Sequence, residues 1–311
     1  MRFNFKLKNH SKHIVGGLLL LSLLVANVAI AKPSRWKNQF YKNPNYFDFG
    51  ICTGLGNYYG DIVPTFFSFQ QLHPDVGFFA RYNIGQYISF RSTLLYGTIS
   101  GNDKFYNNAP RNLSFKSNIQ ELNATMEVNL MPYHHFKTKN IFAPYLFFGI
   151  GFFHFNPKAE YNGTWYALQP LGTEGEGISA AYGSKYPLYG LSIPIGGGLK
   201  YRWQTGYGSY ITLGAEFGIR KTFTDYLDDV SNGHISASWY DSVKAYNGTL
   251  TADLAWREDE YYINQGRTEI VKGNYVPDIR RGNPNNKDWY YFGNITISYV
   301  FRNKAYHFSR R

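Results

Sequence analysis

QELNATMEVNLMP, residues 120–132, alternates polar and apolar side chains without a break from Glu121 to Leu130. A period of two residues places successive side chains on opposite faces, which is typical of a β-strand. One face carries Leu122, Ala124, Met126, Val128 and Leu130, and the other carries Glu121, Asn123, Thr125, Glu127 and Asn129. This stretch therefore predicts a strand whose apolar face and charged face meet two different environments.

The same alternation recurs along the chain and predicts eight strands. The candidate strands are 46–57, 75–83, 88–100, 120–132, 141–155, 189–203, 211–220 and 289–302. Most of them reach the roughly ten residues that a tilted strand needs to cross a bilayer. In two candidates, 75–83 and 141–155, the apolar residues are not confined to one face.

The N-terminus predicts export. Basic residues in the first twelve positions precede an apolar run over 14–31, and Ala29 and Ala31 frame a small-residue cleavage site. This is the organisation of a signal peptide, here 1–31. A permanent membrane anchor is the rival interpretation, but a basic, Pro-containing stretch follows the run directly. The single cysteine, Cys52, excludes an intramolecular disulfide.

Composition separates a membrane barrel from other classes. The chain is 19% aromatic and 17% charged, and no second long apolar run exists to form a transmembrane helix. The net charge of +11 alone would allow a nucleic-acid partner, but export and aromatic richness argue against one. A soluble antiparallel sandwich would alternate in the same way. Aromatic residues at the strand ends favour a membrane, because they would form two interfacial girdles: Tyr58, Tyr59, Tyr82, Tyr87, Tyr133, Phe142, Tyr189, Tyr201, Trp203, Trp289 and Tyr299.

The fold that these patterns predict is all-β, an eight-stranded antiparallel transmembrane β-barrel of the outer membrane. The connections alternate short and long, as in barrels with short periplasmic turns and longer outer loops. The last outer loop, 222–288, is the longest. The predicted organisation is a signal peptide (1–31), a periplasmic N-terminal segment (32–45), the barrel (46–302) and a basic periplasmic tail (303–311).

Eight strands enclose only enough space for side chains, so we expect no open pore. Charged residues on the inward face would fill this space and would have to pair, because an unpaired buried charge is costly. The inward charges are Arg81, Arg91, Glu121, Glu127, Lys200, Arg202, Glu216 and Arg220.

TDYLDDVSNG, residues 224–233, offers the strongest candidates for chemistry. Asp228 and Asp229 with His234 resemble the acidic and His residues of omptin proteases, and His234-Ile235-Ser236 resembles the His-x-Ser of lipid A deacylases. The surrounding sequence lacks the second Asp–His pair of the first class and places the second motif in a loop. We therefore predict a structural loop clasp, in which these aspartates accept backbone N–H groups or pair with Arg280, Arg281 or Lys287. No catalytic residue, metal site or cofactor is expected.

Basic residues gather on the predicted periplasmic side. Those proposed to bind a partner are Lys137, Lys139, Arg302, Lys304, Arg310 and Arg311. Such a rim could grip an acidic protein, orient the barrel, or touch cell-wall polymer. The apolar outer wall of the barrel would contact outer-membrane lipid and lipopolysaccharide.

Three motifs together resemble the PorG family, the barrel components of the type IX secretion system of Bacteroidetes. They are GICTGLGNYYGDIVP (50–64), FGIRKTFTDYLDDVS (217–231) and RGNPNNKDWYYFGNITISYVF (281–301). The resemblance covers essentially the whole mature chain, although 232–280 fits the family motifs least well. It implies a non-enzymatic role in protein secretion and, where present, gliding motility. It also implies association with a periplasmic ring of a PorK-like lipoprotein and a PorN-like protein.

Two other functions remain open at this stage. One is an outer-membrane enzyme that modifies lipid A or cleaves peptides through loop 222–288. The other is an adhesin-like barrel whose outer loops bind a surface ligand.

Overall fold

The structure, a computed structural model, describes residues 45–133, 141–178, 183–206, 209–232, 235–267 and 281–300. The predicted signal peptide and basic tail lie outside these residues, as does the predicted segment 32–45 except for Asn45. Within the described ranges, no helix has the length and apolar character needed to cross a membrane.

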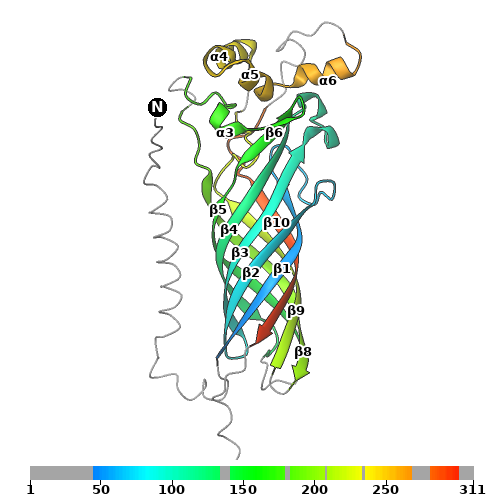
Figure 1. Ribbon diagram of the computed structural model, residues 1–311, viewed down its shortest axis with the longest axis vertical. Coiled ribbons are helices and arrows are strands. Elements are labelled where there is room, and N and C mark those ends of the chain that lie inside the picture. The colour runs from blue at the N-terminus through cyan, green and yellow to red at the C-terminus, as the bar shows by residue number, and fades with distance from the viewer. Residues whose placement is uncertain are drawn as a thin grey trace, which may run out of the picture. The chain divides into compact units, whose positions relative to one another are not determined.

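Eight long strands form a closed antiparallel barrel (Figure 1). Sequence neighbours pair throughout, the first strand pairs with the last, and β3 pairs with β4. The strands are β1 (Tyr46–Tyr59), β2 (His73–Ile84), β3 (Ile88–Asn102), β4 (Ser114–Asn129), β5 (Phe142–His154), β8 (Tyr189–Gly206), β9 (Ser209–Thr222) and β10 (Trp289–Val300). The predicted number of strands and their antiparallel order are confirmed. Closure leaves no unpaired sheet edge, which a membrane-spanning strand requires.

Two short strands extend the sheet to ten without widening the barrel. The hairpin β6 (Pro157–Tyr161) and β7 (Thr164–Ala167) pairs with the outer end of β4 through Lys116 and Ser117. β3 and β4, of 15 and 16 residues, are longer than the roughly ten residues that span a bilayer. Their ends therefore project beyond the membrane and carry the hairpin.

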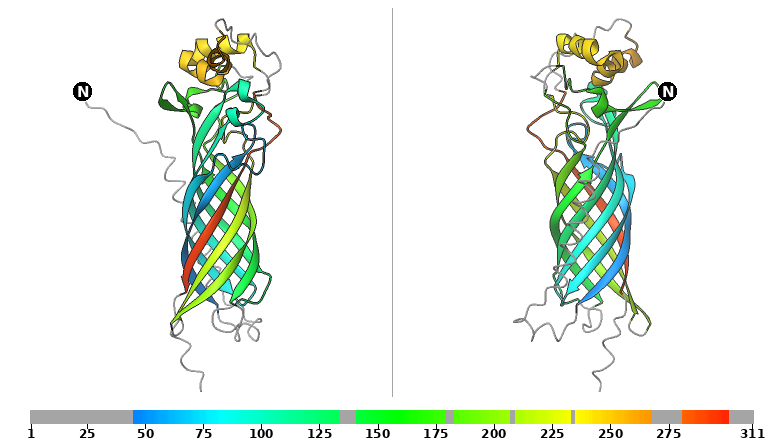
Figure 2. Two further views of the ribbon diagram at one scale, coloured as in Figure 1. Left: turned by 90° about the vertical axis from the view of Figure 1, so that its right-hand side faces the viewer. Right: turned by 60° about the vertical axis from the view of Figure 1, so that its left-hand side comes forward.

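The predicted long loop after β9 contains three helices (Figure 2). They are α4 (Ala237–Asn247), α5 (Thr249–Ala255) and α6 (Glu258–Asn264). The earlier loops add η1 (Asp103–Phe105), η2 (Ala109–Arg111) and α3 (Leu168–Leu171). Trp239, Val243, Ala252 and Ala255 form a small apolar core within the helical segment. We call residues 235–267 the cap. The weak periodicity of 241–262 predicts only one short helix, whereas the structure has three over 237–264.

The barrel is apolar outside and polar inside. Outward residues such as Phe78 and Ile295 are more than 60% exposed, whereas Glu121 and Glu127 are fully buried. This inversion of the usual globular arrangement is the pattern of a barrel whose outer face meets lipid. The predicted faces of β4 are confirmed, because Glu121, Asn123, Thr125, Glu127 and Asn129 all point inward. The chain is therefore a transmembrane β-barrel.

Two of the predicted girdle residues lie elsewhere. Tyr58 and Tyr133 are buried, with 0% and 2% of their surface exposed, and belong to the interior. Position at a strand end does not reveal which face a tyrosine occupies when the strand continues past the membrane. Others of the set, including Tyr189 and Trp203, are exposed as predicted.

In the candidate strands 75–83 and 141–155, apolar residues occupy both faces because aromatic rings point into the barrel. On β2, Phe78 points outward and Phe79 inward, where Arg81 lies 4.9 Å above the Phe79 ring. On β5, inward Phe147 lies 5.3 Å from Arg91. The ring faces attract the buried cations, so apolar residues occur on both faces of these strands.

Glycines on the facing strands make room for one of these rings. A Cβ atom at Gly196 would lie 2.4 Å from the Phe147 ring, and one at Gly218 would lie 2.7 Å from it. Both distances are shorter than any normal contact. The glycines of 193–201 thus serve packing inside the barrel.

An ion network fills the interior as predicted. Glu127 forms ion pairs with three cations: Arg81 Nε at 2.9 Å, Arg91 Nε at 3.2 Å and Lys200 Nζ at 2.6 Å. Asp48 lies 3.2 Å from Arg81, and Glu216 lies 2.6 Å from Arg91. Glu121 pairs with Arg220 at 3.5 Å and accepts a hydrogen bond from the Tyr290 hydroxyl. Because these side chains are buried and mutually paired, they occupy the space that a pore would need.

We predict that Glu127→Gln destabilises the barrel strongly. The substitution leaves three buried cations with one anion fewer, and breaking a buried pair in this way costs roughly 3–5 kcal/mol. Urea unfolding in lipid vesicles measures the free energy of unfolding. Glu160→Gln, on the exposed hairpin, is the matched control and should leave it unchanged. Equal stability of the two variants would contradict a structural role for the network.

Candidate functional site

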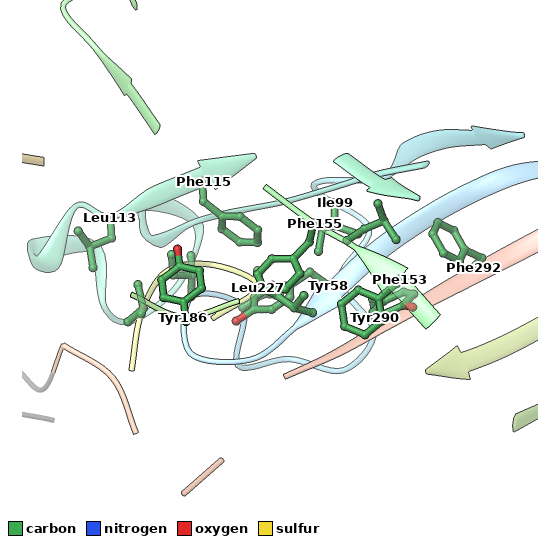
Figure 3. Close-up of a cluster of buried hydrophobic side chains, with 14 of the residues drawn as sticks. Tyr58, Ile99, Leu113, Phe115, Phe153, Phe155, Tyr186, Leu227, Tyr290 and Phe292 are labelled. Carbon is green, nitrogen blue, oxygen red and sulfur yellow. The ribbon is translucent and has the colours of Figure 1, made fainter. Parts of the chain in front are cut away.

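The end of the barrel that carries the long loops, here called the mouth, is closed by an apolar plug (Figure 3). Inward residues from the strand ends pack against residues of the loops that follow. The buried members are Tyr58, Ile62, Val63, Leu95, Ile99, Leu113, Phe115, Ile119, Phe153, Phe155, Tyr186, Leu227, Val230, Tyr290 and Phe292. Leu227 and Val230 come from the TDYLDDV stretch, which is therefore part of the plug.

The apolar positions of TDYLDDV are buried together with its acids. Asp225 accepts a hydrogen bond from Ser231 Oγ at 2.7 Å, and Asp228 accepts one from the Val230 amide at 3.0 Å. Asp229 has a φ of 63°, a left-handed conformation that Asp tolerates better than most residues. Its carboxylate accepts hydrogen bonds from Thr173 Oγ1 and Tyr186 Oη. These bonds fix a tight turn directly above the barrel.

One tyrosine on the first strand joins this turn to the residue that precedes the last strand. The Tyr58 hydroxyl lies 2.6 Å from Asp228 Oδ2 and 2.9 Å from Asp288 Oδ1. Asp288 precedes β10, and its other oxygen accepts from the Leu227 amide at 3.0 Å. One hydroxyl carries one proton, so it donates to one carboxylate and accepts from the other when that group is protonated. Residues of β1 and of the segments flanking β9 and β10 thus meet at a single point.

Two buried arginines bind the loops to one another. Arg281 Nε lies 2.6 Å from Glu174 Oε1, and its Nη2 donates to the Asp229 carbonyl at 3.2 Å and lies 3.9 Å from Asp229 Oδ2. It also donates to the carbonyl of Ala255 in the cap. Arg111 binds Asp103 at 2.6 Å and donates to the carbonyls of Asp61 and Arg281. Each guanidinium therefore ties together segments that are far apart in sequence.

Burial shifts the pKa values of the acids in this turn. The pKa of Asp225 is raised from its usual 3.8 to about 7, chiefly by burial. Burial and then the charge of Asp61 raise the pKa of Asp228 well above its usual range. The pKa of Asp288 is raised by burial and then by Asp228, and that of Asp229 by burial and then by Glu174. The buried carboxyls at the mouth therefore favour their protonated forms.

The predicted clasp residues divide into those the structure describes and those it does not. Asp225, Asp228, Asp229 and Arg281 lie together at the mouth in the contacts given above. Arg280 lies outside the described residues. Lys287, the other basic candidate, donates to the Pro284 carbonyl at 2.7 Å. The predicted partner-binding residues Lys137, Lys139, Arg302, Lys304, Arg310 and Arg311 also lie outside the described residues.

Four residues of the mouth were not predicted to take part in the clasp. Arg111, Glu174, Asp288 and Tyr58 each carry contacts to distant segments. Two of them lie within motifs already noted, since Asp288 belongs to the motif at 281–301 and Tyr58, predicted as a girdle residue, to the motif at 50–64. The long-range pairing could not be derived from local pattern.

The catalytic alternatives receive no support from the described geometry. His234 lies outside the described residues, and Ser236 caps α4 by accepting from the Trp239 amide at 3.2 Å. Among the residues that the structure describes, no group of three or more His, Cys, Asp or Glu side chains is arranged to hold a metal ion. Asp225, Asp228 and Asp229 are buried and accept hydrogen bonds from within the protein.

Together the fold and the mouth define a class: a transmembrane barrel of eight strands whose interior is filled and whose long-loop end is closed. Residues 38–170 match the sequence model of a family described as a domain of unknown function, DUF6089. No curated protein sequence matches the chain.

Solved outer-membrane proteins resemble the chain at low similarity. The attachment invasion locus protein Ail of Yersinia pestis, solved with the heparin analogue sucrose octasulfate, is 7% identical with a TM-score of 0.32, covering 83% of this chain and 97% of its own. Neisserial surface protein A is 8% identical with a TM-score of 0.35, covering 82% and 96%. OprG of Pseudomonas aeruginosa is 6% identical with a TM-score of 0.35, covering 84% and 99%. At these scores the fold rests on the strand pairing of the chain itself.

We predict that the turn at 225–231 loosens as the pH rises. A carboxyl whose folded pKa is raised binds more protons when folded than when unfolded, so its contribution falls as pH increases. For Asp225 the fall occurs between about 4 and 7, from its usual and its shifted pKa. Hydrogen exchange of residues 225–232, corrected for intrinsic rates, should show stronger protection at pH 5 than at pH 8.

Asp225→Asn provides the control for this prediction. The amide oxygen can still accept from Ser231, but the group no longer titrates. The variant should therefore lose part of the difference between pH 5 and pH 8. Equal protection of the unmodified protein at both pH values would contradict the prediction.

Proposed function

We propose that this chain is a non-enzymatic outer-membrane component of the type IX protein secretion system, which positions the periplasmic ring at the membrane. The observation that carries the proposal is the sealed barrel: ion pairs fill its interior and an apolar plug closes its mouth. A barrel sealed in this way offers no route for a solute. Its working surfaces are therefore its two ends and its lipid-facing wall.

The sequence motifs support the choice of system. The TDYLDDV motif and the RGNPNNKDW motif, which resemble the PorG family, meet in space through Arg281, Asp229 and Asp288. Short turns join β2 to β3 and β8 to β9 at the end opposite the mouth. Short turns of outer-membrane barrels face the periplasm. The proposed ring-binding residues of 134–140 and 302–311 follow barrel strands that end there.

The mechanism is geometric. The lipid-facing wall fixes the barrel in the membrane, and the basic side chains at the short-turn end bind acidic surfaces of the PorK-like and PorN-like ring proteins. No bond is made or broken.

Co-purification from detergent-solubilised outer membranes tests this proposal. Deleting 303–311 together with Lys137→Glu and Lys139→Glu should reduce ring proteins recovered with the tagged barrel by about tenfold or more. The control carries Lys104→Glu and Lys244→Glu, two exposed charges at the mouth end, and should recover the ring normally. Both variants must still show the mobility shift of a folded barrel on heating. Normal recovery with the first variant would contradict docking through these residues.

Ligand binding by the cap is a second candidate function. The cap has its own apolar core, yet Tyr246 and Ile263 are 72% and 57% exposed. Replacing 237–264 with a short Gly–Ser linker separates the two functions. Loss of cell-surface binding with normal ring recovery would favour an adhesin-like role, whereas the proposed role predicts that ring recovery does not depend on the cap.

A further inference from the structure

A groove on the outside of the barrel, lined by charged and polar side chains, lies at the edge of the apolar band nearest the mouth. It has a volume of about 370 Å³ and lies between the outer ends of β4 and β5 and the β6–β7 hairpin. The lining residues used below are Lys116, Asn118, Gln120, His154, Lys158 and Trp165. We call this the lysine groove. Its volume is in the range of sites for small molecules.

The strand register fixes the position of the groove relative to the membrane. Leu94, Leu122, Phe152 and Leu191 align across four strands as one outward row. Two residues nearer the mouth, the aligned row is Tyr96, Gln120, His154 and Tyr189. The outward face thus changes from aliphatic and Phe side chains to polar and Tyr side chains over one step. Such a change marks the interface between hydrocarbon and headgroups.

The lysines lie beyond this interface by the depth of a headgroup layer. On β4, Lys116 lies four residues nearer the mouth than Gln120, on the same outward face. At about 3.3 Å per residue and a tilt near 40°, this separation corresponds to about 10 Å along the membrane normal. A molecule in the groove would therefore sit among the headgroups of the leaflet nearest the mouth.

The charges in the groove favour an anion. Lys116 and Lys158 are direct partners in the β4–β6 pairing. Like charges directly opposite each other destabilise a strand pair. Among the described residues neither lysine forms an ion pair with a carboxylate, although Glu160 follows two residues after Lys158 on the same strand. An anion between the two ammonium groups would convert their repulsion into two attractions.

The remaining lining groups favour a sugar. Trp165 is 49% exposed, and Lys116 Nζ lies 6.0 Å from the centre of its ring, so an accessible indole lies beside this cation. An indole face packs well against the C–H face of a pyranose, and its amphipathic character suits a membrane interface. Asn118 and Gln120 offer both donors and acceptors to hydroxyl groups.

From this arrangement we infer that the lysine groove binds the phosphorylated saccharide headgroup of a glycolipid in the outer leaflet. The phosphate lies between Lys116 and Lys158, and the sugar packs on Trp165. The acyl chains run along the adjacent aliphatic row that includes Leu122 and Phe152. This row continues directly from the groove, which is why a lipid fits better than a free sugar phosphate. The inference is independent of any contact with ring proteins.

Binding to lipid nanodiscs tests the inference with the full mature chain. The probe is bisphosphorylated lipid A in phosphatidylcholine nanodiscs, with bound lipid counted by native mass spectrometry. Lys116→Gln with Lys158→Gln should weaken lipid A binding by about tenfold or more, since each basic side chain near a membrane surface contributes about 1 kcal/mol. Lys104→Gln with Lys244→Gln removes the same charge from the mouth end and should leave binding unchanged.

Two further arms separate the parts of the inference. Trp165→Ala should weaken lipid A binding but leave binding of phosphatidylglycerol unchanged. Equal loss for both lipids, or no loss for either, would overturn the saccharide, because Trp165 would then not distinguish a sugar headgroup. Glucosamine 6-phosphate in solution should bind far more weakly than lipid A, and equal binding would overturn the lipid source. Unchanged lipid A binding in the double lysine variant, with the barrel folded, would overturn the site.

Discussion

The interaction on which the rest of the structure depends is the contact of one carboxylate, Glu127, with three cations inside the barrel. A single buried charge in an eight-stranded barrel would be very unfavourable, because water has little space there. Arg81, Arg91 and Lys200 come from three other strands, so Glu127 can be satisfied only when those strands are in register. The network therefore selects the register of the barrel and fills its interior at the same time.

A filled interior moves function to the surfaces. The apolar plug and the two buried arginines close the mouth, and they join loops that start from different strands. β3 and β4 extend beyond the membrane and carry the β6–β7 hairpin, which creates the lysine groove at the lipid interface. The short-turn end lies opposite the closed mouth. One rigid element thus separates the lipid-facing wall from the two ends of the barrel.

The strands and their faces could be predicted because lipid on one side and packed polar groups on the other impose a period of two residues. The alternation from Glu121 to Leu130 carried this signal without any knowledge of tertiary structure. The mouth could be predicted only in part. Asp228 and Asp229 stood out as a pair, but their contacts with Tyr58 and Arg281 join residues more than 50 positions apart. The cap helices were predicted only as one short helix within 241–262, because their periodicity is weak, and Tyr58 was assigned to a girdle that its strand passes beyond.

The central claim is that this barrel is sealed, and single-channel conductance in a planar lipid bilayer tests it most directly. The account predicts that the purified, folded barrel inserts without producing steady conductance, because ion pairs and aromatic rings occupy its interior. Insertion must be verified independently, for example by protease protection of the strands in the same membranes. A stable, ohmic conductance from inserted wild-type protein would contradict the account, since an open pathway cannot coexist with the packed network.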